Sequence, residues 1–215
     1  MTLLSTALTT CPLIAILRGI EPEEVIEIGG CLVDAGFVLI EVPLNSPNPL
    51  HSISKLANKF GKHVIIGAGT VLTVEEVEDV ANAGGQIIIS PNTNVDIIIK
   101  TKSLGLISIP GFATITEAFA ALEAGADALK MFPAEGLSPS FLRAMRAVLP
   151  GNIPVLPVGG IGSDNMMEYI AAGAQGFGIG SSLYKPGKET IEVTHSARHM
   201  IEAWRTCRLE HYSIK

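Results

Sequence analysis

The feature that most constrains the fold of this chain is a glycine that recurs every 20 to 26 residues. These glycines stand where a helix-like segment gives way to an apolar, strand-like one: Gly36, Gly61, Gly84, Gly105, Gly125, Gly151 and Gly173. The stretches "DAGFVLIEVP", "EAGADALKMF" and "AAGAQGFGIG" show the pattern clearly. Because glycine adopts the left-handed conformation just past a helix most readily, we expect these residues to be helix C-caps. One repeat has the length of one strand plus one helix.

The repeat predicts eight strands that alternate with eight helices. We expect the strands near residues 13–18, 38–43, 64–69, 87–90, 106–110, 128–132, 154–158 and 176–180. Amphipathic patterns predict helices between them, for example over 22–35, 73–83, 114–124 and 138–149. Expected start signals of these helices are Pro22, Thr73 with Glu75, and Ser138 before Pro139.

Strict alternation of strand and helix indicates a parallel sheet. A chain of 215 residues is long enough for one large α/β domain, so we expect a single (β/α)8 TIM barrel over residues 1–215. The alternative is an open, doubly wound sheet. The steady period and the lack of a GxGxxG fingerprint favour the closed barrel.

Composition limits which binding partners and which cellular compartment are expected for this chain. The formal net charge is −6 and no run of basic residues occurs, which argues against a nucleic-acid partner. No apolar stretch approaches the roughly 18 residues of a membrane span. The first residues lack a basic region, so we expect no signal peptide. Cys11, Cys31 and Cys207 are widely spaced, and we interpret them as free thiols in a reducing cytoplasm.

Functional side chains gather at the predicted carboxyl ends of the strands, where the active site of a barrel lies. Strands one, two, three and six end at Arg18, Glu41, Thr70 and Lys130. The other strand ends carry small residues or proline, which leave room for a ligand: Ser90, Pro91, Pro110, Gly159, Gly160, Gly180 and Ser181.

Lys130 and Glu41 stand in apolar strands, where a buried charge is costly. A desolvated amine loses proton affinity, so Lys130 would be a neutral nucleophile that forms a Schiff base with a ketone. Glu41 would be a general base with a raised pKa. The alternatives are a Lys130 that reaches solvent and a Glu41 that is only an ion-pair partner of Lys130 or Arg18. The planar guanidinium of Arg18 suits a substrate carboxylate, although it could also bridge helices.

Two glycine-rich loops follow the last two predicted strands. "VGGIGSDN" and "GIGSSLY" offer backbone N–H groups and the Ser181 hydroxyl, as phosphate-binding loops of barrels do. His195 and His199 have a spacing compatible with a metal, but no third ligand is evident and we interpret them as a solvated helix face. We therefore predict no metal site.

Several motifs, in order along nearly the whole chain, resemble one family. The stretches "AILRG", "IEVPLNSP", "IGAGTVL", "ISPNTN", "PGFATITEAFAALEAGADALKMFPA", "VGGI" and "GIGSSLY" are similar to the 2-keto-3-deoxy-6-phosphogluconate and 6-phosphogalactonate aldolases. The resemblance implies a class I aldolase on a (β/α)8 barrel, without a metal or other cofactor, that forms a homotrimer and acts on a phosphorylated keto-deoxy sugar acid.

The resemblance also implies a role for each matching residue. Lys130 would form the Schiff base and Glu41 would be the acid/base. Thr70 would contact the pyruvyl carboxylate. The remaining predicted pocket and phosphate residues are Pro91, Phe132, Val158, Gly159, Gly160, Gly180 and Ser181.

One departure bears on the substrate. Phosphogluconate enzymes read "EVTLRT", with a carboxylate-binding arginine where this chain has Asn45. The form "EVPLNSP" resembles the phosphogalactonate branch, in which Arg18 would take that duty, and Val158 also resembles that branch. The two substrates differ only in configuration at C4, so a single pocket residue could set the preference. From Asn45 and Val158 we predict the phosphogalactonate substrate. Phosphogluconate or 4-hydroxy-2-oxoglutarate cleavage is the alternative; a barrel isomerase or decarboxylase, or a phosphosugar-binding protein without activity, is the remote one.

Overall fold

The computed structural model describes residues 2–213 of the chain, and side chains over residues 2–210. The strands are β1 (Leu13–Ile16), β2 (Leu39–Pro43), β3 (Ile65–Gly69), β4 (Ile87–Ile89), β5 (Ile107–Ile109), β6 (Gly111–Phe112), β7 (Leu129–Met131), β8 (Val155–Pro157) and β9 (Phe177–Ile179). The helices are α1 (Leu3–Thr10), α2 (Val25–Ala35), α3 (Pro49–Phe60), α4 (Val74–Asn82), α5 (Val95–Ser103), α6 (Ile115–Glu123), α7 (Pro139–Arg146), α8 (Met166–Ala171) and α9 (Thr190–Ser213), with a 3₁₀ turn, η1, at Ala134–Gly136.

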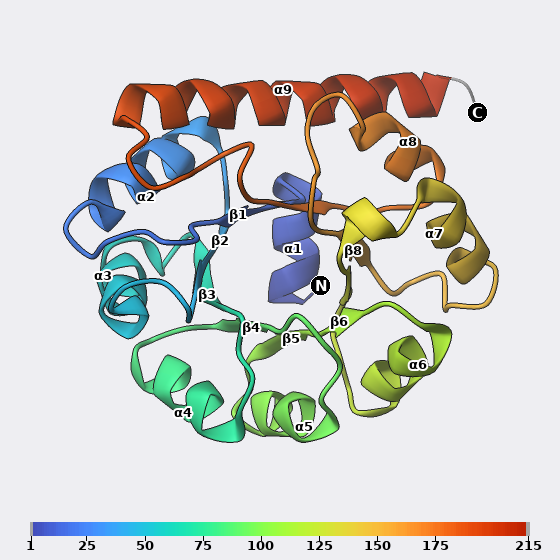
Figure 1. Cartoon of the computed structure of the whole chain (residues 1–215), viewed down its shortest axis with the longest axis horizontal. Helices are drawn as coiled ribbons and strands as arrows, with labels where there is room; N and C mark the ends of the chain where they lie inside the picture. The colour runs from blue at the N-terminus through green and yellow to red at the C-terminus, as the bar shows by residue number, and fades with distance from the viewer. Residues whose placement is uncertain (1, 214–215) are drawn as a thin grey trace.

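The strands are parallel and curl around a common centre, with helices on the outside (Figure 1). Six strands form one sheet in the order β5-β4-β3-β2-β1-β9, and three form a second sheet in the order β6-β7-β8. An isolated parallel bridge between Val158 and Gly178 joins the two at β8 and β9. The fold is thus α/β with a curled parallel sheet, and the regular strand–helix alternation is confirmed.

All eight predicted strands occur near their expected positions, and the fifth is divided by Pro110 into β5 and β6. Five of the seven glycines have the expected positive φ: Gly36, Gly84, Gly105, Gly125 and Gly173. The prediction is wrong for Gly61, which continues the right-handed conformation with φ −61°, and Gly151 has no positive φ either.

The predicted helix starts hold with two corrections. Residues 22–24 form a turn, and α2 begins at Val25 instead of Pro22. The capping box of α4 pairs Thr73 with Glu76, the third residue of the helix, and not with Glu75. Ser138 accepts the hydrogen bond from Phe141 N–H at the start of α7, as expected.

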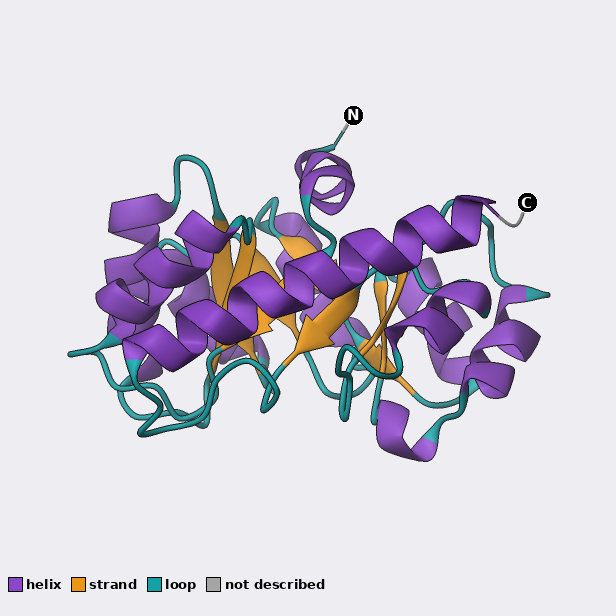
Figure 2. Cartoon of the chain, turned by 90° about the horizontal axis from the view of Figure 1, so that it is seen from above, coloured by secondary structure: helices purple, strands orange, loops and turns teal. Residues whose placement is uncertain are grey.

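Helix α1, which the repeat does not predict, covers one end of the strands. Its Leu4 and Ala7 pack with the first inward-facing residues of the strands, such as Leu39, Ile65 and Ile87. In Figure 2, α1 lies beside the N label on one side of the strands, and long loops lie on the opposite side. The strands' carboxyl ends therefore form the other, uncovered face. Within the described residues, no helix is both long and apolar enough to cross a membrane.

Candidate functional site

Alternation along the strands places Lys130 and Glu41 inside the curled sheet. Leu39 of β2 and Ala128 before β7 belong to the inner apolar cluster. Residues two apart on a strand share a face, so Glu41 and Lys130 also face inward, one layer nearer the carboxyl ends. Both line one small cavity whose other walls are Ile14, Ile16, Ile89, Ile109, Leu156, Val158 and Gly178.

Lys130 is buried in this cavity, with 5% of its surface exposed, so it does not reach solvent. Its Nζ lies 4.6 Å from the centre of the Phe132 ring. Burial lowers the pKa of Lys130, the charge of Arg18 lowers it further, and the charge of Glu41 opposes both. These surroundings favour the neutral amine, which is the form that attacks a carbonyl carbon.

Glu41 is 2% exposed, and its Oε2 atom has no hydrogen-bond partner. Burial raises the pKa of Glu41 to about 7, against the opposing charges of Lys130 and Arg18. No ion pair within 4.0 Å joins Glu41 to either cation in the described part of the chain. The ion-pair alternative is therefore wrong in its direct form. A buried, unpartnered carboxylate oxygen is suited to accept a proton or hydrogen bond from a ligand.

Gly69 provides the space that Glu41 occupies. A Cβ atom built on Gly69, at the end of β3, would lie 1.4 Å from Glu41 Oε2. Any other residue at position 69 must displace the carboxylate. The glycine of "IGAGT" therefore determines where the acid/base candidate lies.

Gly69→Ala is expected to lower kcat by about 10²-fold or more, because the carboxylate must leave its place while the strand stays intact. Gly151→Ala is the matched control, since its Cβ would meet open space. Steady-state kinetics with a thermal melt of each variant measures the effect. Equal activity of the two variants would show that the position of Glu41 is unimportant.

Arg18 is held by the loop that follows β2. Its Nη1 donates a hydrogen bond to Asn45 Oδ1 at 3.2 Å. The neighbouring Gly19 N–H donates to the buried Ser46 hydroxyl at 2.9 Å. Asn45 and Ser46 thus fix both the side chain and the backbone of the "RG" pair. Arg18 is exposed, so its guanidinium can also face a ligand.

Most of the other predicted residues line a larger pocket of about 430 Å³. They are Arg18, Phe132, Val158, Gly159, Gly160, Gly180 and Ser181. Ile16, Val158 and Gly178 line both this pocket and the inner cavity, so the two adjoin. Gly159 and Gly160 have φ of +104° and +64°, and a Cβ on Gly160 would lie 2.4 Å from Glu135 Cγ. Both positions therefore require glycine.

The structure does not bring Thr70 and Pro91 into either cavity. Both follow the carboxyl ends of their strands, β3 and β4, and both are half-buried. Thr70 has φ +56°, which is an uncommon conformation for a β-branched residue and is found at functional sites. The Ser90 hydroxyl donates to Val71 O at 2.8 Å and ties these two strand ends together.

Sequence reasoning missed Glu135, Tyr184 and Lys185, which also line the larger pocket. The Tyr184 hydroxyl donates to Glu24 Oε1 at 2.5 Å and links the loop after β9 to the start of α2. The one sequence feature that could have indicated Lys185 is its place in the loop that carries Ser181, four residues later. Of the histidine pair His195 and His199, His199 bonds Ser163 Oγ through Nε2 at 2.9 Å.

Comparison with known proteins gives consistent matches. The sequence model of the family "Aldolase: KDPG and KHG aldolase" matches residues 4–200. The chain is 44% identical to "2-dehydro-3-deoxy-6-phosphogalactonate aldolase" of Escherichia coli K12, over 92% of this chain and 96% of that protein. It is 46% identical to "Probable 2-dehydro-3-deoxy-6-phosphogalactonate aldolase" of Rhizobium meliloti 1021, over 90% and 91% of the two chains.

A solved structure gives the same result. The protein described as "Native KDPGal structure" superposes with a TM-score of 0.91 at 43% identity, over 92% of this chain and 96% of that one. The family match, the two relatives and this superposition each cover most of the chain. The chain therefore belongs to the KDPG and KHG aldolase family.

Proposed function

We propose that this chain is a class I aldolase that reversibly cleaves 2-dehydro-3-deoxy-6-phospho-D-galactonate to pyruvate and D-glyceraldehyde 3-phosphate. The observation that carries the proposal is the pair of buried side chains, Lys130 and Glu41, in one apolar cavity at the carboxyl ends of β7 and β2. A neutral amine and a carboxyl group with a pKa of about 7 are the two groups that iminium chemistry requires.

Lys130 begins the reaction. Its neutral amine adds to the C2 ketone of the sugar acid to give a carbinolamine. Loss of the former ketone oxygen as water then leaves a protonated iminium between Nζ and C2. The positive nitrogen accepts electrons from the adjacent C3, so it makes the later bond cleavage possible.

Glu41 then supports cleavage between C3 and C4. As a carboxylate it takes the C4 hydroxyl proton, directly or through a water, and the C3–C4 electron pair moves to form an enamine. D-Glyceraldehyde 3-phosphate leaves with C4 as its aldehyde carbon. A proton returns to C3, and water hydrolyses the iminium to release pyruvate and free Lys130.

The two ends of the substrate have separate binding groups in this proposal. Arg18, positioned by Asn45, binds the C1 carboxylate, and Thr70 contacts the same end after a small movement from its present position. The loops with Gly159, Gly160, Gly180 and Ser181 bind the phosphate through backbone N–H groups and a hydroxyl. Pro91 and Phe132 form part of the wall of the substrate-binding site. Fixing both ends orients C2 toward Lys130.

The choice of the galactonate substrate is supported by the names of the two relatives and by two residues. Asn45, at the position where phosphogluconate enzymes have an arginine, accepts a hydrogen bond from Arg18. Val158 lines both cavities. A pocket residue that contacts C4 stabilises the transition state of one epimer relative to the other by about 1–3 kcal/mol.

The value of kcat/KM for the phosphogalactonate epimer is expected to exceed that for the phosphogluconate epimer by about 10- to 200-fold. A coupled assay of pyruvate release on both epimers and on 4-hydroxy-2-oxoglutarate measures it. A reversed preference would assign the phosphogluconate activity. No pyruvate from any of the three would reject the aldolase itself.

We further propose that the strands close into a (β/α)8 barrel within one domain over residues 1–215. The Val158–Gly178 bridge and the hydrogen bond from Lys130 N–H to Pro110 O support closure at the two joins between the sheets. Exposed apolar side chains on the neighbouring helices α5 and α6, such as Ile99 and Phe119, are compatible with a homotrimer interface. A cytoplasmic location follows from the metabolic role.

A further inference from the structure

Lys185 lies on the loop after β9, at the wall of the larger pocket. The backbone from Gly180 to Tyr184 forms a single helical turn, in which Tyr184 N–H donates to Gly180 O at 3.0 Å. Ser181 lies in this turn and Lys185 directly follows it. Both residues line the pocket.

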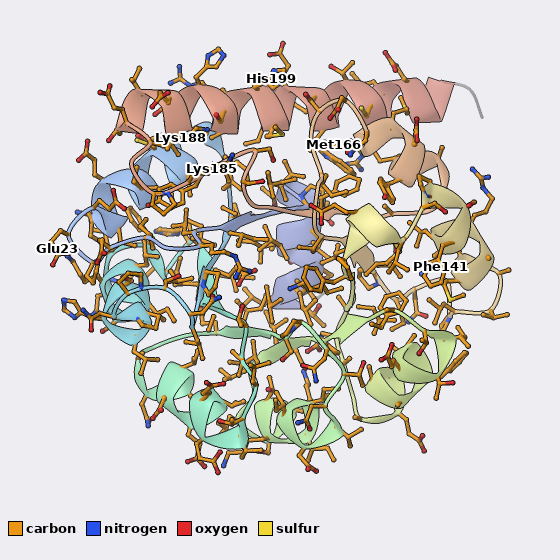
Figure 3. All side chains as sticks on the ribbon, viewed as in Figure 1. Glu23, Phe141, Met166, Lys185, Lys188 and His199 are labelled. Atoms are coloured by element: carbon orange, nitrogen blue, oxygen red, sulfur yellow. The ribbon has the colours of Figure 1, made fainter. Side chains whose placement is uncertain are left out.

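The backbone around Lys185 is fixed on both sides. Tyr184 is anchored through its hydroxyl to Glu24. Pro186 packs against Gly19, where a Cβ would lie 2.7 Å from the proline ring. Lys188 Nζ donates to Leu183 O at 3.0 Å and to Ser196 Oγ at 2.9 Å. Figure 3 shows Lys185 nearer the centre of the view than Lys188, which lies beside α9.

The side chain of Lys185 is nevertheless unengaged. Among the described residues, no hydrogen bond or ion pair involves its Nζ atom, and the residue is exposed. A positive charge held at a pocket wall without a protein partner is available to an anionic ligand.

The charges of the pocket wall explain why a cation is needed there. The charged lining residues are Arg18, Glu135 and Lys185. Arg18 is bonded to Asn45, and its charge acts on the inner pair Lys130 and Glu41. The carboxylate of Glu135 lies against Gly160 and would repel a phosphate bound there. Lys185 is the remaining cation that offsets it.

We propose that Lys185 binds the phosphate group of the substrate and thereby sets the preference for phosphorylated over unphosphorylated aldehydes. The proposal rests on the proposed function for the identity of the substrate. Ser181 and the glycine loops direct hydrogen bonds at the phosphate oxygens, and Lys185 adds the opposite charge. Binding energy at this end, remote from the reacting carbons, orients C4 for the reaction.

The experiment compares Lys185→Met, Lys185→Arg and the wild type in the condensation of pyruvate with D-glyceraldehyde 3-phosphate or with D-glyceraldehyde. The ratio of kcat/KM for the two aldehydes is expected to fall about tenfold in Lys185→Met, equal to about 1.4 kcal/mol. The fall should come from the phosphorylated aldehyde alone, and Lys185→Arg should restore most of the ratio.

Lys62→Met is the matched control, because Lys62 is an exposed lysine that precedes β3, at the amino ends of the strands, and does not line the pocket. It removes the same charge from the protein and is expected to leave the ratio within about twofold of the wild type. An unchanged ratio in Lys185→Met, or an equal fall in Lys62→Met, would overturn the proposal. Melting temperatures of all three variants report any loss of folding.

A second readout separates this proposal from the proposed function. Titration with inorganic phosphate, followed by the ³¹P line width without pyruvate, measures phosphate binding in the absence of turnover. Weaker binding to Lys185→Met than to Lys62→Met supports the phosphate contact even if the wild type cleaves no aldol. A wild type that condenses pyruvate but shows the same phosphate affinity in both variants retains the aldolase function and loses the role of Lys185.

Discussion

Lys130→Met is expected to lower kcat/KM for aldol cleavage by at least about 10⁴-fold, because methionine has no nitrogen to bond the C2 carbon. The methionine side chain has a similar length and fits the apolar cavity around position 130. The variant should therefore fold, and its melting temperature should equal or exceed that of the wild type.

Lys130→Arg distinguishes covalent from electrostatic action. Arginine keeps the positive charge but does not form an iminium, so we expect the same loss as with methionine. A barrel isomerase or decarboxylase that used Lys130 only for its charge would retain measurable activity in this variant. Addition of EDTA should leave the wild-type rate intact.

Covalent trapping completes this test. Incubation of the wild type with pyruvate and borohydride should add one reduced pyruvyl group, and peptide mass mapping should place it on Lys130. Lys188→Met should be labelled as fully as the wild type, and Lys130→Met should not be labelled. An unlabelled wild type would reject the Schiff base.

Glu41→Gln is expected to lower kcat by about 10²- to 10⁴-fold, since an amide neither accepts nor returns the proton at C4 and C3. The pH dependence gives a sharper signature. In the wild type, kcat/KM should rise with pH up to about 7, where Glu41 becomes a carboxylate, and level off above it. The residual activity of Glu41→Gln should lack this limb. A limb that persists unchanged would assign the titration to another group.

The same substitution has a predicted effect on stability. Burial raises the pKa of Glu41 in the folded chain, so the carboxyl group favours folding most at a pH below its unfolded pKa. This contribution is lost as pH rises to about 7. Glu41→Gln should therefore increase the free energy of unfolding at pH 8 by about 1–3 kcal/mol and have little effect near pH 4. Denaturant unfolding at the two pH values measures the difference.

The sequence was sufficient for the features that follow from strand periodicity. Strand positions, the parallel arrangement and the inward direction of Lys130 and Glu41 all depend on apolar runs and on alternation of side chains. The same reasoning places Thr70 and Pro91 at the correct edge of the sheet. It gives no direction for residues beyond the last paired position, and these two do not enter the described cavities.

Features set by loop contacts were not predictable. The hold of Asn45 and Ser46 on Arg18 and Gly19 joins residues 27 positions apart, and only the sheet order brings their loops together. Gly61 and Gly151 lack the left-handed φ because a glycine after a helix permits that conformation without requiring it. Helix α1 was not predicted because it lies before the first repeat, where no recurring glycine marks it, and its N-cap is Thr2.

The cover that α1 places over the amino ends of the strands has a consequence for the order of events. Because Leu4 and Ala7 pack over that side, we expect the substrate to reach Lys130 through the opposite mouth. In the proposed reaction the three-carbon keto acid occupies the blind end, and the aldehyde lies between it and the exit. Synthesis must then load pyruvate first, and cleavage must discharge the aldehyde first, which predicts an ordered kinetic pattern.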